Sequence, residues 1–447
     1  MLNTIVELIL LAGLVGGILR TQKERQQTVL LLGVIFVTGL HLTTGLIRWQ
    51  RIPLYVAIGG WLLMQAQVLP IKRWVKGLLM SMLLFSALAN QAFPLYSMPT
   101  PSGPSLIGTR SYILTDTSRE EIYSSTEQPR RFKIQMWYPV EATAGFDRAL
   151  WIEDGVEMKR ALAVDMGLPG FVFDPLATFV SSAYQEAPLG SQMAQYDVVI
   201  ISHGWSSLRT LHTDLAEELA SYGMMVIAIE HTYGSLATRF SESDIEFLNR
   251  QALPRRAVTP DYLDYANRLV NTFAGDIGFT LDWLEAMSVD ESHWLHDRIQ
   301  PASVTVIGHS TGGGAAVKAA MVDQRIQRVI GFDPWVEPLT EEEIATGTST
   351  PSLYLRSEAW EIGENNSALL PLLNKSPNTT LYQLQGTTHY DFAMVYMFSP
   401  LSPLLGVTGS LNRDYLNDFL FTTVREFIKS SDASQFIGSI PELRLIS

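Results

Sequence analysis

Residues 303–320 read SVTVIGHSTGGGAAVKAA, and the fold of the chain can be worked out from this stretch. It opens with a β-branched run, Val304 to Ile307, which is typical of a buried parallel strand. It closes with alanines that favour a helix packed closely on a sheet. Between them, Gly308-His309-Ser310-Thr311-Gly312 matches the G-x-S-x-G nucleophile elbow. The pattern predicts Ser310 as a nucleophile on a strained turn whose flanking glycines remove clashes; the alternative is a purely structural glycine-rich turn.

Strand and helix patterns alternate on both sides of this stretch, which predicts a mostly parallel sheet with helices on both faces. An antiparallel pair at a sheet edge is expected first, and an irregular excursion over residues 141–196 follows it. The excursion is expected to cover the sheet as a lid rather than to add strands. The expected strands are 108–114, 131–138, 197–202, 225–230, 304–307, 328–332, 352–356 and 380–385, and the expected helices are 208–222, 261–287, 315–320 and 412–431.

Charge divides the chain of 447 residues into two parts. Residues 1–97 carry eight Lys and Arg against two acids, whereas the remainder carries 24 Lys and Arg against 43 Asp and Glu. An acidic domain of this kind argues against nucleic acid as a partner, because phosphate binding needs a basic face. The chain has no cysteine, which excludes disulfides and cysteine-based metal sites.

The first part is predicted to be a membrane segment of about four helices, and residues 98–447 a catalytic domain. Each apolar run approaches the ~20 residues that span a bilayer, and a signal peptide would be a single run. Six of the eight basic residues fall on one side of the predicted topology, so the positive-inside rule places the catalytic domain outside the cytoplasm. The runs are 5–19, 29–47, 54–69 and 77–93.

A serine nucleophile needs a base and an orienting acid, and in α/β-hydrolases the order along the chain is Ser, Asp or Glu, then His. After Ser310 the only histidine is His389, which follows the last long strand pattern. Asp333 ends the strand pattern after the elbow, so it is the predicted acid. The acids that stay open as alternatives are Glu337, Glu358 and Glu361.

The oxyanion hole is expected to use two backbone amides, those of Thr311 and Trp205. Trp205 follows His203-Gly204 at the end of an earlier strand. His203 and His309 are interpreted as local hydrogen-bonding and packing residues. His293 and His296 could ligate a metal, but no third ligand accompanies them, so no metal and no cofactor is predicted.

Aromatic residues near the strand ends are core residues by default, and three of them could also line an acyl pocket: Trp335, Tyr390 and Phe392. Within the excursion, a group of apolar residues is expected to contact lipid or to cover the core: Phe171, Val172, Phe173, Leu176 and Phe179.

Four segments together resemble the plasma and intracellular-type platelet-activating-factor acetylhydrolases: HGWSSLRTLHTDLAEELASYGMMVIAIEHTYGS (203–235), GHSTGG (308–313), GFDPWVEPL (331–339) and GTTHYDF (386–392). The resemblance covers about residues 101–430. It implies an α/β-hydrolase fold, a Ser310–Asp333–His389 triad and calcium-independent removal of short or oxidised acyl groups from phospholipids. The chain departs from the animal members in residues 1–97 and 141–196.

The expected function is therefore that of a membrane-anchored serine ester hydrolase acting on esters or phospholipids, with membrane lipid as a partner and an undetermined oligomeric state. A general carboxylesterase or polyesterase is the alternative within the enzymes. A non-catalytic membrane receptor or scaffold built on a hydrolase fold is the alternative from another class.

Overall fold

The computed structural model of the chain describes residues 32–39, 48–66, 69, 72–94, 98–361, 363–432 and 441–446. The chain divides into two compact units. One comprises residues 1–95 with 399–401, and the other comprises residues 96–398 with 402–447. Each unit has its own apolar cluster of buried side chains.

In the first unit, helices α3 (Ile52–Gln65) and α4 (Arg73–Ala92) pack against each other through Trp61, Leu79 and their neighbours, and residues 32–39 are also helical. Within the described residues, α4 is the single helix long and apolar enough to cross a membrane, and it coincides with the fourth predicted run. The third run corresponds to α3, which has 14 residues. The first run lies outside the described residues, and so does most of the second. A segment of four spans therefore stays a prediction.

The second unit is built on one sheet with the strand order β13-β12-β11-β10-β9-β5-β6-β2-β1-β4-β3. Its six central strands, from β12 to β6, all pair in parallel, and antiparallel strands extend both ends. The bounds are β1 Leu106–Glu120, β2 Pro129–Val140, β3 Arg148–Leu150, β4 Val180–Gln185, β5 Tyr196–Ser202, β6 Met224–Glu230, β7 Ala237–Arg239, β8 Ile245–Phe247, β9 Ile299–His309, β10 Ile326–Phe332, β11 Ser352–Ser357, β12 Thr379–Leu384 and β13 Leu443–Leu445.

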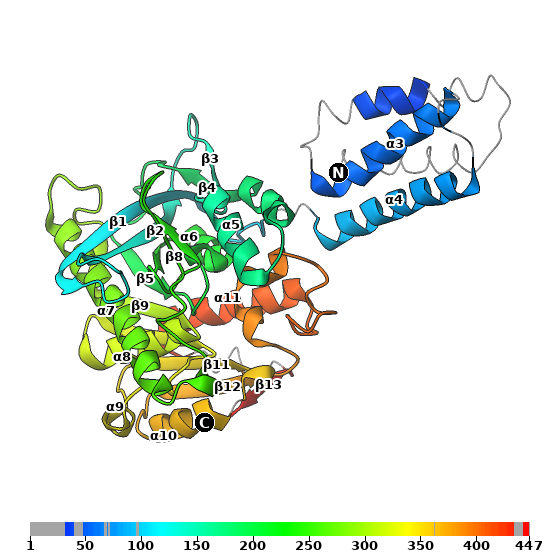
Figure 1. Cartoon of the computed structure of the whole chain (residues 1–447). Helices are drawn as coiled ribbons and strands as arrows, with labels where there is room; N and C mark the ends of the chain where they lie inside the picture. The colour runs from blue at the N-terminus through cyan, green and yellow to red at the C-terminus, as the bar shows by residue number, and fades with distance from the viewer. Residues whose placement is uncertain are drawn as a thin grey trace. The chain divides into compact units, whose positions relative to one another are not determined.

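Helices cover both faces of this sheet (Figure 1), which confirms the predicted architecture. Successive side chains of a strand point to opposite faces, so in β5 Val198 and Ile200 belong to one core cluster and Val199 and Ile201 to the other. Helices α7, α8 and α10 bury their apolar residues in the first cluster, and α6 and α11 in the second. The bounds are α5 Gly155–Met166, α6 Thr213–Ser221, α7 Tyr262–Val289, α8 Thr311–Val322, α9 Glu341–Thr346, α10 Gly363–Asn374 and α11 Arg413–Ser430.

Residues 141–196 are more regular than the sequence predicts. They form β3, α5, a long 3-10 stretch (Gly170–Thr178) and β4. Strand β4 pairs in parallel with β1, and β3 pairs with β4, so this stretch adds strands to the sheet and the β1–β2 pair is not its edge. The prediction that the stretch adds no strands was wrong, because β3 has only three residues and β4, with the sequence VSSAYQ, holds no continuous apolar run.

The apolar group singled out in this stretch divides unequally between core and solvent. Phe171 is 48% exposed, whereas its four companions are buried: Val172, Phe173, Leu176 and Phe179. Those four side chains therefore cover the core. The exposed large apolar residues of the same stretch are Phe146, Leu150, Val156, Val164, Met166, Leu168, Phe171, Val180 and Met193.

Candidate active site

Ser310 occupies the turn between β9 and α8, with φ 55° and ψ −118°, a backbone conformation rare for a residue with a side chain. The neighbouring glycines are required sterically. A Cβ on Gly308 would lie 2.2 Å from the carbonyl oxygen of Gly312, and one on Gly312 would lie 2.1 Å from that of Ser202. Because Ser310 directly follows β9, it lies at the carboxyl edge of the sheet, where ligands of parallel sheets bind. Its side chain is half-buried there.

Asp333 follows β10 directly and is fully buried, with φ 44°. Its carboxylate accepts three hydrogen bonds. The backbone N–H of Ser357 donates to Oδ1 at 2.6 Å, the Ser357 hydroxyl donates to Oδ2 at 2.6 Å, and Nδ1 of His389 lies 2.9 Å from Oδ2. A buried charge needs such partners, so Asp333 is fixed as a hydrogen-bond acceptor for the imidazole.

His389 begins a 3-10 turn (His389–Phe392) in the loop that follows β12. Its ring stacks on Trp360, with centroids 3.9 Å apart and planes at 15°. Nε2 of His309 lies 3.0 Å from the carbonyl oxygen of His389. Because burial holds the pKa of His309 well below its usual range, His309 is neutral and donates Nε2–H to that carbonyl. Both the ring and the main chain of His389 are thereby held.

The other candidate acids have partners elsewhere. Glu337 pairs with Arg256, Glu358 accepts the backbone N–H of Gly386, and Glu361 lies 3.4 Å from a guanidinium nitrogen of Arg356. The structure thus brings His389 to Asp333 and to none of these three glutamates.

The two predicted oxyanion donors lie on adjoining segments. Thr311 is the first residue of α8, and the N–H groups of a first helical turn have no partner within the helix. Trp205 follows Gly204, where an added Cβ would lie 3.0 Å from Cβ of Ser310. In the described part of the chain, neither of these N–H groups donates to a protein acceptor. Both donors therefore flank the serine and are available to an oxygen.

The three aromatic residues predicted to line an acyl pocket differ in exposure. Tyr390 is 50% exposed, whereas Phe392 is buried and stacks on Phe332. Trp335 is also buried and packs against the core cluster beside α7 and α8. Of these three, only Tyr390 presents a large open surface.

Sequence reasoning missed Ser357 and Trp360, which hold Asp333 and His389. Ser357 is the last residue of β11 and Trp360 lies just after it, and β11 pairs with β10, the strand that precedes Asp333. Their position at the end of a strand was a usable signal, but neither residue type marks a site by itself. His293 and His296 lie in the turn after α7, and no group of three His, Asp or Glu residues arranged for a metal occurs within the described ranges.

Comparisons with known proteins identify the family of the chain. The family model of "Platelet-activating factor acetylhydrolase, isoform II" matches residues 91–414. The platelet-activating factor acetylhydrolase of Canis lupus familiaris is 25% identical over 281 residues, which are 58% of this chain and 62% of that protein. The chain thus spans about three fifths of the length of this relative.

Two microbial esterases are also similar. Cutinase est1 of Thermobifida alba is 24% identical over 198 residues, covering 44% of this chain and 54% of the cutinase. The solved structure of a ferulic acid esterase from Streptomyces cinnamoneus superposes with a TM-score of 0.64 at 21% identity, covering 79% of this chain and all of the esterase chain. This likeness supports the α/β-hydrolase type of fold.

Proposed function

Because this chain belongs to the platelet-activating factor acetylhydrolase, isoform II family, we propose that it hydrolyses carboxylic esters through an acyl-serine intermediate. The observation that carries the proposal is the Asp333–His389 hydrogen bond beside a serine on a positive-φ elbow. The bound His389 Nδ1 leaves Nε2 free to act as a base. Nucleophile, acid and base follow strands β9, β10 and β12, which are parallel and end at the same edge of the sheet.

In the proposed reaction, Nε2 of His389 takes the proton of Ser310 while Oγ attacks the ester carbonyl. The carbonyl oxygen becomes an oxyanion, which accepts hydrogen bonds from the amides of Trp205 and Thr311. Collapse breaks the bond to the alcohol oxygen, and the imidazolium returns its proton to that leaving group. A water then attacks the acyl-serine with His389 as base, which releases the carboxylic acid and restores Ser310. Asp333 stays ionised throughout and stabilises the imidazolium.

No hydrogen bond between Ser310 Oγ and His389 occurs among the described contacts. Bonds of this kind are often long in free enzymes and form with bound substrate. We therefore place that contact in the substrate complex.

For the substrate, we propose a phospholipid with a short or oxidised acyl chain. Support comes from the family match and from the Canis relative, whose name specifies platelet-activating factor. The second candidate, a general ester or polyester hydrolase, is favoured by the similarity to the Thermobifida cutinase. Rates on phospholipids of graded acyl length, compared with p-nitrophenyl esters and a solid polyester, separate the two substrate classes.

We further propose that the N-terminal unit anchors the enzyme in a membrane and that the catalytic unit faces outward. Anchoring is supported by the apolar helix α4 together with the exposed apolar residues Val164, Phe171 and Leu404 of the catalytic unit. The orientation is supported by the excess of Lys and Arg on one side of the predicted spans. Protease added to intact cells is expected to digest the catalytic unit; protection until the membrane is lysed would reverse the orientation.

Ser310→Ala is the test of the mechanism. It is expected to lower kcat by about 10⁴- to 10⁶-fold, as in other triads, and to abolish labelling by a fluorophosphonate. Near-normal ester hydrolysis by the folded variant would refute the assignment of Ser310.

A further inference from the structure

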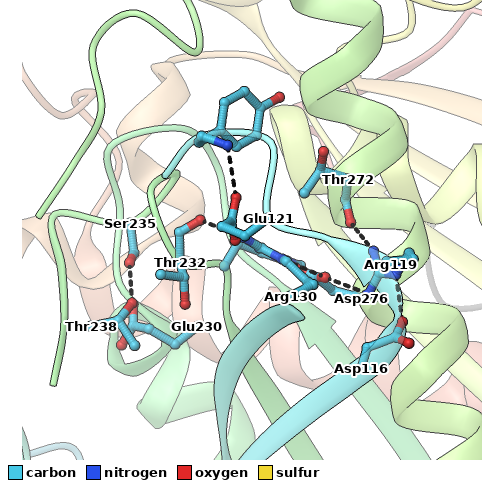
Figure 2. Close-up of polar contacts among 12 residues, drawn as sticks. Asp116, Arg119, Glu121, Arg130, Glu230, Thr232, Ser235, Thr238, Thr272 and Asp276 are labelled. Carbon is cyan, nitrogen blue, oxygen red and sulfur yellow. Dashed lines mark hydrogen bonds and ion pairs between the residues drawn. The ribbon is translucent and has the colours of Figure 1, made fainter. Parts of the chain in front are cut away.

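A continuous chain of buried polar groups leads from the sheet to the loop that carries Trp205. Figure 2 shows its start, where the guanidinium of Arg130 lies between Asp276 and Glu121. Arg130 donates to both carboxylate oxygens of Asp276, at 3.0 and 2.6 Å, and to the carbonyl oxygen of Thr232 at 3.0 Å. Arg130 and Asp276 are both buried. Because a buried ion pair tolerates little displacement of either partner, the Asp276 carboxylate is a rigid acceptor.

His231, which follows β6, continues the chain. Its Nδ1 lies 3.0 Å from Oδ2 of Asp276, and its Nε2 lies 2.8 Å from the hydroxyl of Ser202. Burial lowers the pKa of His231, so the ring is neutral with its proton on Nδ1, and Nε2 accepts the Ser202 hydroxyl. The Ser202–His231–Asp276 set repeats the bonding of a triad, but all three side chains are inaccessible to solvent. Its role is therefore to fix His231.

His203 is the next link. The backbone N–H of His231 lies 3.2 Å from Nε2 of His203, which must accept it and so carries no proton there. The proton of His203 is consequently on Nδ1, which lies 2.7 Å from the carbonyl oxygen of Gly204. Burial holds the pKa of His203 well below its usual range, which agrees with a neutral ring.

This last hydrogen bond fixes the peptide between Gly204 and Trp205. The C=O and N–H of a planar trans peptide point in opposite directions. When His203 binds the Gly204 carbonyl, the Trp205 N–H must point away from His203. The same peptide lies against the nucleophile, since a Cβ on Gly204 would be 3.0 Å from Cβ of Ser310.

We propose that His203 is a positioning residue for the oxyanion hole, acting through the Gly204 carbonyl to hold the Trp205 N–H where the oxyanion forms. This inference rests on the proposed acyl-serine mechanism. A purely structural role is the rival explanation, because the His203 ring also packs edge-on against Phe273 and His231. A purely structural role predicts that replacing His203 lowers stability and does not weaken transition-state binding more than substrate binding.

The test compares His203→Asn, His203→Gln and His203→Ala in the full-length chain. The amide nitrogen of Asn is as many bonds from Cα as Nδ1 of His, so Asn keeps a donor for Gly204, whereas Gln and Ala place none there. The measurements are kcat and KM for p-nitrophenyl acetate, the inhibition constant of a trifluoromethyl ketone that adds to serine, and Tm. Ile277→Val in α7 is the control for a small change in the same core.

His203→Ala and His203→Gln are expected to lower kcat by about 10- to 100-fold, somewhat less than removal of an oxyanion donor, with KM within about twofold. Binding of the trifluoromethyl ketone should weaken by the same factor by which kcat/KM falls, because its adduct with serine mimics the transition state. His203→Asn should retain most of the activity. Ile277→Val should leave kcat/KM and the inhibition constant unchanged.

Equal losses in Asn and Gln, or an unchanged inhibition constant beside a lowered kcat, would overturn the inference. So would full activity in His203→Gln. If His203→Ala does not fold, the Asn and Gln variants still decide, since they keep a polar side chain of similar size. Fluorophosphonate labelling of Ser310 distinguishes failure of this inference from failure of the proposed function. If Ser310 is labelled but the His203 variants keep their activity, only this inference fails. If the Ser310→Ala variant stays active, the proposed function fails.

Discussion

Replacement of Trp360 tests how much the environment of His389 contributes to the reaction. The two rings stack with centroids 3.9 Å apart, and the His389 side chain is 18% exposed. In the proposed mechanism His389 becomes an imidazolium in each transition state, so a stacked aromatic face stabilises it there more than in the resting enzyme. A cation over an aromatic ring gains about 0.5–1 kcal/mol at exposed sites and about 2 kcal/mol when desolvated. The low exposure of His389 places the gain at about 1–2 kcal/mol.

Because about 1.4 kcal/mol is a factor of ten in rate, Trp360→Leu is expected to lower kcat/KM by about 5- to 30-fold. Trp360→Phe keeps an aromatic face and should stay within about threefold of the wild type. Initial rates on p-nitrophenyl acetate measure the effect, and Tm confirms that both variants are folded. Equal rates for the Leu variant and the wild type, or equal losses in Leu and Phe, would refute the stacking argument.

Three further predictions concern other parts of the chain. Asp333→Asn should lower kcat by about 10⁴-fold by favouring the wrong imidazole tautomer, with Tm showing a folded protein; a loss below tenfold would contradict the role of Asp333. Burial raises the pKa of Glu217 to about 7 from a usual 4.5. As the pH rises from 4.5 to 7, the unfolded chain loses the Glu217 proton before the folded state does, so Glu217 lowers the free energy of unfolding at high pH. Glu217→Gln should therefore raise Tm at pH 8 and change it little at pH 4.5, and a variant less stable at pH 8 would contradict this sign. Finally, a chain starting at Pro101 should keep its rate on soluble esters and lose activity on bilayer phospholipid, whereas equal effects on both would count against membrane tethering.

The central strands were predictable because each is a continuous apolar run next to a helical pattern. Strands β5, β6, β10, β11 and β12 fall within about two residues of their expected bounds, whereas β9 begins five residues earlier than expected, at Ile299. Parallel strands end at one edge of a sheet, so the same pattern also predicted Ser310, Asp333 and His389 as neighbours at that edge. The strands β3 and β13 were not found because three residues carry too little periodicity, and β4 was not found because its sequence, VSSAYQ, holds no continuous apolar run.

The supporting residues of the site could not be predicted from sequence. Trp360 contacts His389 through a stacked ring, which depends on where loops from different strands meet. His203, by contrast, bonds to the carbonyl oxygen of the next residue, Gly204, in agreement with its interpretation as a locally hydrogen-bonding residue. His309 illustrates the same limit. It was interpreted as a packing residue, and its bond to the His389 carbonyl joins positions 80 residues apart. Tertiary contacts of this kind leave no local signature in the sequence.

The positions of the nucleophile and the acid follow from main-chain pairing rather than from their own side chains. The N–H of Ser310 donates to the carbonyl of Phe332 at 3.0 Å, and the carbonyl of Ser310 accepts the N–H of Trp335 at 2.9 Å, so the serine turn is bonded on both sides of Asp333. Ser310 and Asp333 each have positive φ, which costs about 1–3 kcal/mol per residue when other contacts do not impose it. These backbone bonds impose it, and they survive replacement of either side chain. Ser310→Ala and Asp333→Asn should therefore keep the fold, so that a loss of activity in either variant reports on chemistry and not on collapse of the site.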